Sequence, residues 1–375
     1  MRARKLAELV VLLSCVACAP ARREPSPDPA PPKVAPQLPL KAASASGLMY
    51  ACQAAAQMLT QSEDYAEPVV DAEASRVLAA TLRAHDVRDD AGFKRAVDLF
   101  YQSRGDDYDF LYLYVADDGG GTYGLHLPIQ AYHLPTLGMF SRGEAELAAE
   151  HPRLRSVILM KLLEDGDSGP TLHELAHYWA NGLGLWPELG FPMDRHWGGT
   201  GVGGQLGGFR TDRLKCREPQ DASPPDCKVG PDGRYDVNMP AYGTIANGGN
   251  NVPYAPLELY LMGLLPASEV PPIAQLVDPK RLNAESSLVD GLYSVASVRY
   301  VSAEQISAAT GGPPPERLDK DGPLRVAFAL VSPTADPQHL AQVALNARRF
   351  AAVELSPTYS WCTATGGRSL IRADL

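Results

Sequence analysis

The chain has 375 residues, of which 45% are hydrophobic and 21% charged, so it has a globular composition and room for one large domain or two smaller ones. Its 34 basic and 44 acidic side chains give a formal net charge of -10, which repels nucleic-acid phosphates and anionic membrane surfaces. This composition excludes a wholly disordered chain and argues against nucleic-acid binding.

The first 18 residues have the pattern of an export signal. Three of the first five residues are basic, and the apolar run that follows, 9–13, is too short to span a bilayer permanently. A cysteine then follows small residues, which resembles the lipobox of bacterial lipoproteins, where the cysteine is acylated and becomes the new N-terminus. Cys15 and Cys18 both fit, and we favour Cys15 because Leu12 stands three residues before it. We therefore expect an exported lipoprotein of the outer membrane or periplasm; a plain secretory signal is the alternative.

Three sections follow this lipoprotein signal. Residues 19–46 are dominated by Pro, Ala and Ser, a composition that buries too little surface to fold, so we interpret them as a disordered tether. From residue 47 onward the composition becomes globular. We expect a main domain over residues 47–285 and a C-terminal α/β subdomain over residues 286–375, where helix and strand patterns alternate.

The spacing of apolar residues indicates the first helices and strands of the main domain. Helical spacing predicts one helix around Leu78 and Leu82 and a second around Val97 and Phe100. Aromatic and β-branched runs bounded by turn residues predict three strands, at residues 108–115, 125–129 and 156–160.

A helix is predicted after the third of these strands. Asp167 or Ser168 fits as its cap, and Pro170 is tolerated in its first turn. His173 and His177 share one face of this helix. The neighbouring face is an apolar stripe of Leu172, Leu175, Ala176, Trp179 and Leu183.

Residues 198–256 are rich in Gly, Asn, Asp and Pro and lack periodicity, so we expect a long irregular segment. Loops of this length in compact domains are usually functional. A short helix over residues 256–263, ended by glycine, should follow. The C-terminal elements expected are a helix at 303–309, a strand at 324–331, a helix at 338–353 and a strand at 369–373.

Four cysteines lie beyond the signal, and in an oxidising compartment they allow two bridges in three connectivities. We favour Cys216 with Cys227, which closes a small loop in the irregular segment. Cys52 would then pair with Cys362 and tie the start of the domain to its end. Unpaired buried thiols are the alternative.

The run His173-Glu174-Leu175-Ala176-His177 carries the clearest chemical signal. Two histidines four residues apart on a helix can hold one zinc ion, and a glutamate beside the first can act on a zinc-bound water. Zinc lowers the pKa of that water to about 7, and Glu174 as general base takes its proton and passes it to the leaving amine. The other interpretation is an amphipathic helix with solvated histidines.

A catalytic zinc ion needs a third protein ligand and leaves its fourth position to water. His196 follows His177 by nineteen residues, enough for the chain to leave the helix and fold back. Glu258, on a later predicted helix, is the alternative, since another large class of such enzymes uses a glutamate. We favour His196 because imidazole suits zinc and the chain has only eight histidines. The others are expected on the surface or satisfied in the core: His85, His126, His133, His151 and His339.

Three blocks of the chain, residues 172–179, 196–197 and 254–264, carry a family resemblance that extends upstream to residues 108–111. They resemble a group of bacterial secreted or lipoprotein zincin-like proteins. The resemblance implies an α+β, zincin-like fold, in which a mixed sheet packs on the active-site helix and a C-terminal α/β elaboration follows.

More distantly, the chain looks like a metzincin, in which three histidines lie above a methionine turn. Met262 is the candidate for that turn, and ordinary core packing is its alternative role. The sequence departs from the metzincin pattern at Leu183, where the third histidine would stand. A donor for the tetrahedral oxyanion is also expected. Tyr254 is our first choice, ahead of Tyr242 and Tyr260.

Together these features predict a zinc peptidase that hydrolyses protein or peptide amide bonds at the cell envelope. The expected cofactor is Zn²⁺, and the expected partners are a peptide substrate and, through the lipid anchor, a membrane; we expect a monomer. A non-catalytic envelope binding protein with a relic or structural metal site is the alternative, and a peptidoglycan amide hydrolase is a third interpretation. Only an enzyme needs Glu174, so substitution of this residue distinguishes the classes.

Overall fold

The computed structural model describes thirteen stretches of the chain, all within residues 39–375, the second of the two units into which its contacts divide it. They are residues 52–53, 77–79, 90–102, 104–105, 107–116, 124–134, 144–161, 170–193, 196–239, 250–282, 291–332, 336–353 and 358–374. The export signal, both candidate lipidation cysteines and the tether lie outside these residues. Within the described stretches, no helix combines the length and the apolar character that crossing a membrane requires.

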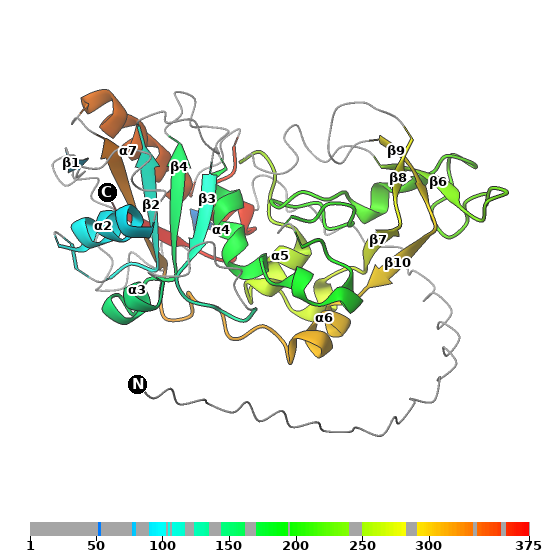
Figure 1. Cartoon of the computed structure of the whole chain (residues 1–375), viewed down its shortest axis with the longest axis horizontal. Coiled ribbons are helices and arrows are strands. Elements are labelled where there is room, and N and C mark those ends of the chain that lie inside the picture. The colour runs from blue at the N-terminus through cyan, green and yellow to red at the C-terminus, as the bar shows by residue number, and fades with distance from the viewer. Residues whose placement is uncertain are drawn as a thin grey trace, which may run out of the picture. The chain divides into compact units, whose positions relative to one another are not determined.

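A mixed six-stranded sheet forms the main layer, in the order β1-β11-β2-β4-β3, with β12 also beside β11 (Figure 1). Five strands are parallel: β1 (Val77–Ala79), β11 (Leu324–Ser332), β12 (Ile371–Asp374), β2 (Phe110–Val115) and β4 (Ser156–Lys161). The sixth, β3 (Gly124–Pro128), pairs antiparallel with β4 at the edge of the sheet. This confirms a mixed α/β protein with a mixed sheet, as the α+β expectation required.

Helices cover both faces of this sheet, which explains why β2 is a continuous apolar run rather than an alternating one. Phe110, Tyr112 and Tyr114 of β2 belong to the apolar cluster of one face, together with side chains of helices α4 (Thr171–Ala180) and α7 (Pro337–Ala351). Leu111 and Leu113 belong to the cluster of the other face, with side chains of α2 (Asp90–Tyr101) and α3 (Glu144–Glu150). Helix α4 packs on β3 and β4, so the HExxH helix lies beside the edge strand.

Smaller elements follow α4 and surround a third apolar cluster. A four-stranded antiparallel sheet has the order β5 (Lys215–Cys216), β6 (Tyr235–Met239), β9 (Gly291–Val295) and β8 (Lys280–Arg281). Strands β7 (Ile273–Val277) and β10 (Ser297–Val301) form an antiparallel pair. The remaining helices are α5 (Pro256–Leu261), α6 (Ala303–Thr310) and α8 (Trp361–Ala364), with 3₁₀ turns at Leu183–Leu185, Pro187–Leu189, Thr211–Arg213 and Ala267–Glu269.

Both expected disulfides are present. Cys52 bonds to Cys362, and Cys216 bonds to Cys227. The first joins the beginning of the domain to α8 near its end, and the second closes a loop beside β5. Because disulfides persist in oxidising compartments, the pair indicates an exported protein.

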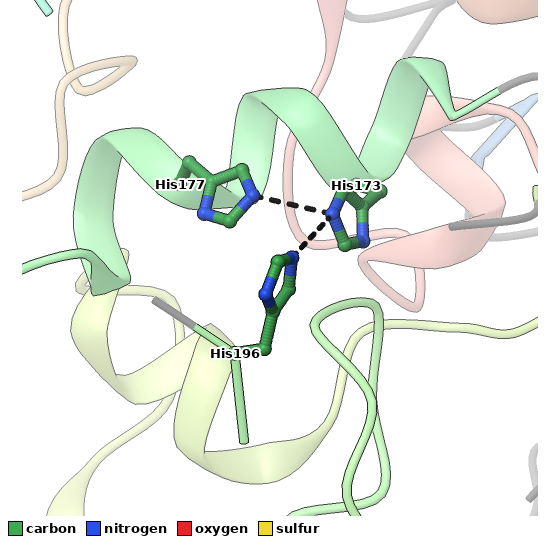
Figure 2. A group of neighbouring side chains, drawn as sticks. All are labelled: His173, His177 and His196. Atoms are coloured by element: carbon green, nitrogen blue, oxygen red, sulfur yellow. Dashed lines mark hydrogen bonds between the residues drawn. The ribbon is translucent and has the colours of Figure 1, made fainter. Parts of the chain in front are cut away.

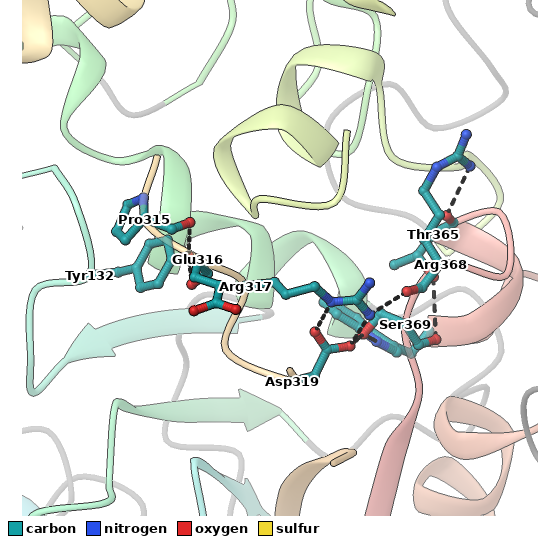
Figure 3. A network of polar contacts seen from close by, with 9 residues as sticks. Tyr132, Pro315, Glu316, Arg317, Asp319, Thr365, Arg368 and Ser369 are labelled. Atoms are coloured by element: carbon teal, nitrogen blue, oxygen red, sulfur yellow. Dashed lines mark hydrogen bonds and ion pairs between the residues drawn. The ribbon is translucent and has the colours of Figure 1, made fainter. Parts of the chain in front are cut away.

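Polar contacts join the segment after α6 to the C-terminal residues (Figure 3). Arg317 donates from Nη2 to Asp319 Oδ2 over 2.7 Å and also donates to the carbonyl of Arg368, while Ser369 donates to the same aspartate. Tyr132, which follows β3, donates to the carbonyl of Glu316 over 2.7 Å. The bonds of Arg317 and Asp319 to Arg368 and Ser369 hold the residues just before β12 against a segment about fifty residues earlier in the chain.

One expectation about the fold is wrong. Leu78 lies in strand β1, not in a helix, because residues 77–79 pair in parallel with residues 330–332 of β11, and Leu82 lies outside the described residues. The C-terminal residues contribute β11 and β12 to the main sheet, in which β11 lies between β1 and β2. The segment 198–256 contains β5 and β6 and is therefore less irregular than expected. The other expected strands and helices that fall on described residues are confirmed, with their ends shifted by a few residues.

Candidate metal centre

The N-terminus of α4 is fixed by side chains from a distant segment. Pro170 is its N-cap residue and supplies no side-chain cap, so the backbone N–H of Leu172 donates instead to Asn250 Oδ1 over 3.1 Å. The Tyr254 hydroxyl donates to the carbonyl oxygen of Leu172 over 2.9 Å. The caps expected at positions 167 and 168 lie outside the described residues. Every residue of α4 is buried, so the helix is held on all sides.

Three imidazoles converge beside this helix, as Figure 2 shows. His173 Nε2 lies 3.2 Å from His177 Nε2 and 3.3 Å from His196 Nε2. The first two histidines come from adjacent turns of α4, and His196 comes from the segment that returns after the 3₁₀ turns. The ligand atoms of all three lie within 4.8 Å of one another, close enough to hold a single metal ion.

Hydrogen bonds on the outer side of the rings set the tautomers of the two helical histidines. His173 Nδ1 lies 2.6 Å from the carbonyl oxygen of Gln205, which can only accept, so Nδ1 carries the proton and Nε2 presents its lone pair. His177 Nδ1 donates in the same way to Asn181 Oδ1 over 2.7 Å. Two lone pairs about 3 Å apart repel unless a cation lies between them, so these two nitrogens fit a metal ion.

Burial keeps these imidazoles in the form that binds metals. Desolvation lowers the pKa of His173 from 6.5 to about 4 and brings the pKa of His177 well below its usual range. The neighbouring histidine rings lower both further, because two positive charges so close together repel. Near neutral pH both rings are therefore uncharged ligands.

A cavity of about 220 Å³ opens at the triad and includes Glu174. Its lining is Gly124, Leu125 and His126 of β3, His173, Glu174 and His177 of α4, and Asn181 and His196. Burial raises the pKa of Glu174 to about 8, while the backbone N–H of His126 donates to the carboxylate and opposes that rise. A carboxyl group with a pKa near neutrality can exchange a proton at physiological pH.

Gly124 makes room for this carboxylate. A Cβ at position 124 would lie 2.4 Å from Glu174 Oε1 and 2.6 Å from Glu174 Cγ, both well inside contact distance. The edge strand and the helix can therefore approach this closely only because residue 124 has no side chain.

His126 is a cavity residue that sequence reasoning missed. It is buried, and its Nε2 lies 2.8 Å from Ser156 Oγ of the neighbouring strand. The expectation of a satisfied core residue was right about its burial but not about its place beside Glu174. The period-two alternation of β3, which puts residues 124 and 126 on one face, was the available signal.

Glu258, the alternative third ligand, lies elsewhere. Its carboxylate is occupied by four N–H donors and is not among the cavity residues, so the structure brings His196, and not Glu258, to the histidine pair. Tyr254 is likewise outside the cavity lining, with its hydroxyl committed to Leu172, so the expected oxyanion role is not supported. Met262 is buried in the apolar cluster that contains α4, and its methionine-turn role stays a prediction.

The described residues thus gather the converging imidazoles of His173, His177 and His196, the carboxylate of Glu174 and the edge strand with His126 around one cavity. The chain matches no family model, no curated protein and no solved structure.

Proposed function

We propose that this protein is a zinc-dependent peptidase that hydrolyses protein or peptide amide bonds at the bacterial cell envelope. The observation that carries the proposal is the convergence of His173, His177 and His196 in the cavity that also contains Glu174. Three imidazole ligands that leave a fourth position open are the ligand set of a catalytic rather than a structural zinc site.

The distances within the triad support zinc as the ion. Zinc bound tetrahedrally at roughly 2.0–2.1 Å from each nitrogen separates neighbouring nitrogens by about 3.3 Å. The two Nε2 separations from His173 are 3.2 and 3.3 Å. Imidazole also binds copper, nickel and iron, so direct metal analysis has to identify the ion.

The chain's own groups have separate roles in the proposed reaction. When bound, zinc supplies Lewis-acid chemistry and brings the pKa of water to about 7. Glu174 lines the same cavity and is the base that would take a proton from water and return it to the leaving amine. Burial raises its pKa to about 8 in the metal-free site, and the charge of a bound zinc ion would lower that pKa and favour the carboxylate form. His126 supports Glu174 through its backbone N–H.

The edge strand favours an extended peptide as substrate. Among the described strands, β3 pairs only with β4, so an extended peptide could add along its other edge beside the His126 N–H, which donates to Glu174. Gly124 and Leu125 of this strand line the cavity. A mixed sheet that packs on the HExxH helix is also what the expected zincin-like fold implies.

Two variants of the mature protein test the proposal. With zinc bound, the wild type should cleave members of a broad fluorogenic peptide library. The Glu174→Ala variant should keep one equivalent of zinc and lose cleavage, and His173→Ala should lose both. Absence of zinc from the wild type, or undiminished cleavage by Glu174→Ala, would rule out this mechanism, and zinc binding without cleavage would favour the non-catalytic alternative.

A further inference from the structure

We propose that Glu258 is a positioning residue of the metal centre, and that it acts on His173 through one peptide group, the one between Gln205 and Leu206. The inference rests on the metal site of the proposed function, but it does not require that the site hydrolyse anything. It replaces the expectation that Glu258 binds the metal directly.

Glu258 is a buried carboxylate whose oxygens are fully occupied. It is 1% exposed. Oε1 accepts from Trp197 Nε1 over 2.8 Å and from the backbone N–H of Leu206 over 2.9 Å. Oε2 accepts from the backbone N–H of Gln205 over 3.0 Å and of Ala255 over 2.8 Å. All four partners are donors, so only the ionised carboxylate satisfies them all. Burial raises the pKa of Glu258, and these four hydrogen bonds oppose that rise.

One of these bonds leads directly to a ligand of the metal site. The N–H of Leu206 and the C=O of Gln205 belong to the same peptide group. That N–H donates to Glu258, and that C=O accepts from His173 Nδ1 over 2.6 Å. The order is therefore carboxylate, peptide group, imidazole.

Such a chain strengthens the ligand. A carboxylate bound to the N–H end of a peptide group polarises it, so the C=O end becomes a better acceptor. A stronger acceptor on Nδ1–H makes Nε2 more basic and fixes the ring orientation, as a carboxylate does when it contacts a metal-binding histidine directly. The three imidazoles bring no negative charge of their own, so Glu258 supplies it one peptide group away.

The same carboxylate also supports the segment that carries His196. Trp197, the next residue, donates its ring N–H to Glu258, and its backbone N–H donates to the carbonyl of Leu206 over 2.9 Å. Gly204 lets the carboxylate approach, because a Cβ there would lie 2.2 Å from Glu258 Oε2. Glu258 thus holds both the peptide group that binds His173 and the residue next to His196, so it acts on metal ligands from two separate parts of the chain.

The Glu258→Gln variant tests the proposal, since it keeps the shape and places an NH₂ group against two N–H donors. Removal of an outer-shell partner typically lowers metal affinity about 10- to 100-fold. We expect Zn²⁺ affinity, measured by competition with a chromophoric chelator, to fall at least about tenfold, and the Co²⁺ absorption spectrum to change. Tyr254→Phe is the matched control: it also loses one buried hydrogen bond near α4, but that bond ends at the Leu172 carbonyl and lies outside the path from Glu258 to His173, so Zn²⁺ affinity should stay at the wild-type value.

Thermal unfolding distinguishes a positioning role of Glu258 at the metal site from a purely structural role. A structural role would lower Tm equally with and without Zn²⁺, whereas positioning reduces the rise in Tm that Zn²⁺ produces. If Glu258→Gln does not fold, Gly204→Ala displaces the carboxylate without removing its charge and should also weaken Zn²⁺ binding. Gly199→Ala, whose Cβ would meet only Leu276 Cβ at 4.0 Å, is its control and should bind normally.

The possible results separate the two proposals. Wild-type Zn²⁺ affinity in a folded Glu258→Gln or Gly204→Ala variant overturns the positioning role and leaves the metal centre intact. Failure of the wild type to bind Zn²⁺ overturns both.

Discussion

Gly124→Ala should impair catalysis without removing the metal. The added Cβ would lie 2.4, 2.6 and 2.7 Å from Oε1, Cγ and Cδ of Glu174, and no metal ligand is among these nearest atoms. Residue 124 does not have a positive φ, so the strand itself accepts alanine. Because Cγ is involved, rotation of the carboxylate alone cannot relieve the contact, and the Glu174 side chain must move.

The distance by which the Glu174 side chain must move determines how far kcat/KM falls. Carbon atoms pack at roughly 3.5–4.0 Å, so a contact of 2.6 Å requires a shift of roughly 1 Å. Misplacement of a catalytic group by 1 Å can cost about 100-fold in rate, which corresponds to about 3 kcal/mol of transition-state stabilisation. We therefore expect kcat/KM to fall about 100-fold while the zinc content stays at the wild-type value.

The assay compares kcat/KM on one cleaved fluorogenic peptide with zinc content from atomic absorption. Gly105→Ala is the control, since its Cβ would meet nothing closer than Asp107 Oδ2 at 3.7 Å, and it should retain activity. Wild-type kcat/KM in Gly124→Ala would refute the assignment of Glu174 as the base in this cavity. Loss of zinc would instead mean that Gly124 supports the metal ligands.

Three further predictions concern the supports of the site. Tyr254→Phe should lower the unfolding free energy by about 1 kcal/mol, from loss of the buried bond to Leu172, and leave kcat unchanged; a tenfold fall in kcat would restore a catalytic role for this tyrosine. His196→Ala should weaken Zn²⁺ binding at least about 100-fold in chelator competition, because a two-histidine site remains, and unchanged binding would mean that another residue is the third ligand. The metal-free protein should lose stability as the pH falls from 6.5 to about 4, by about 3 kcal/mol from His173 alone, because the unfolded state takes up the proton that the buried ring resists. Urea midpoints across this pH range should be measured in the Glu174→Gln background. The pKa of Glu174 is raised from 4.5 to about 8, so Glu174 makes stability change with pH in the opposite direction between these values. A urea midpoint that does not change with pH would contradict the burial of His173.

The central strands could be predicted because their burial on both faces leaves an unbroken apolar run. Residues 110–115 and 156–161 are strands in the structure, close to the ranges that the sequence indicated. Strand β1 could not be predicted in this way. It has only three residues, and its partner β11 lies about 250 residues later, so no local pattern specifies it.

A local sequence signal bears on whether His196 or Glu258 is the third metal ligand, in addition to the metal preference of each side chain. Glu258 is the N3 residue of a helix with proline at N1, and its side chain accepts from the N-cap backbone N–H of Ala255. A glutamate at N3 is expected to turn back on its own helix start. The Glu258 carboxylate therefore caps the start of α5, and His196 is the residue whose ligand atom lies near those of His173 and His177.

The side chains that hold the metal site in place lie in one segment, residues 250–258, and no sequence motif identifies this segment. Asn250 accepts from the backbone N–H of Leu172, Tyr254 donates to the carbonyl of Leu172, and Glu258 accepts from the backbone N–H groups of Gln205 and Leu206. The HExxH pattern places two ligands and a base on one helix face through helical periodicity alone, which is why the sequence predicts them. The His173 ring is oriented by the carbonyl oxygen of Gln205, 32 residues away, and the first turn of α4 is held by Asn250 and Tyr254, 78 and 82 residues from Leu172. These positions follow from packing rather than from spacing. A motif therefore identifies what can bind the metal, whereas the residues that hold the ligands in place become visible only once the chain is folded.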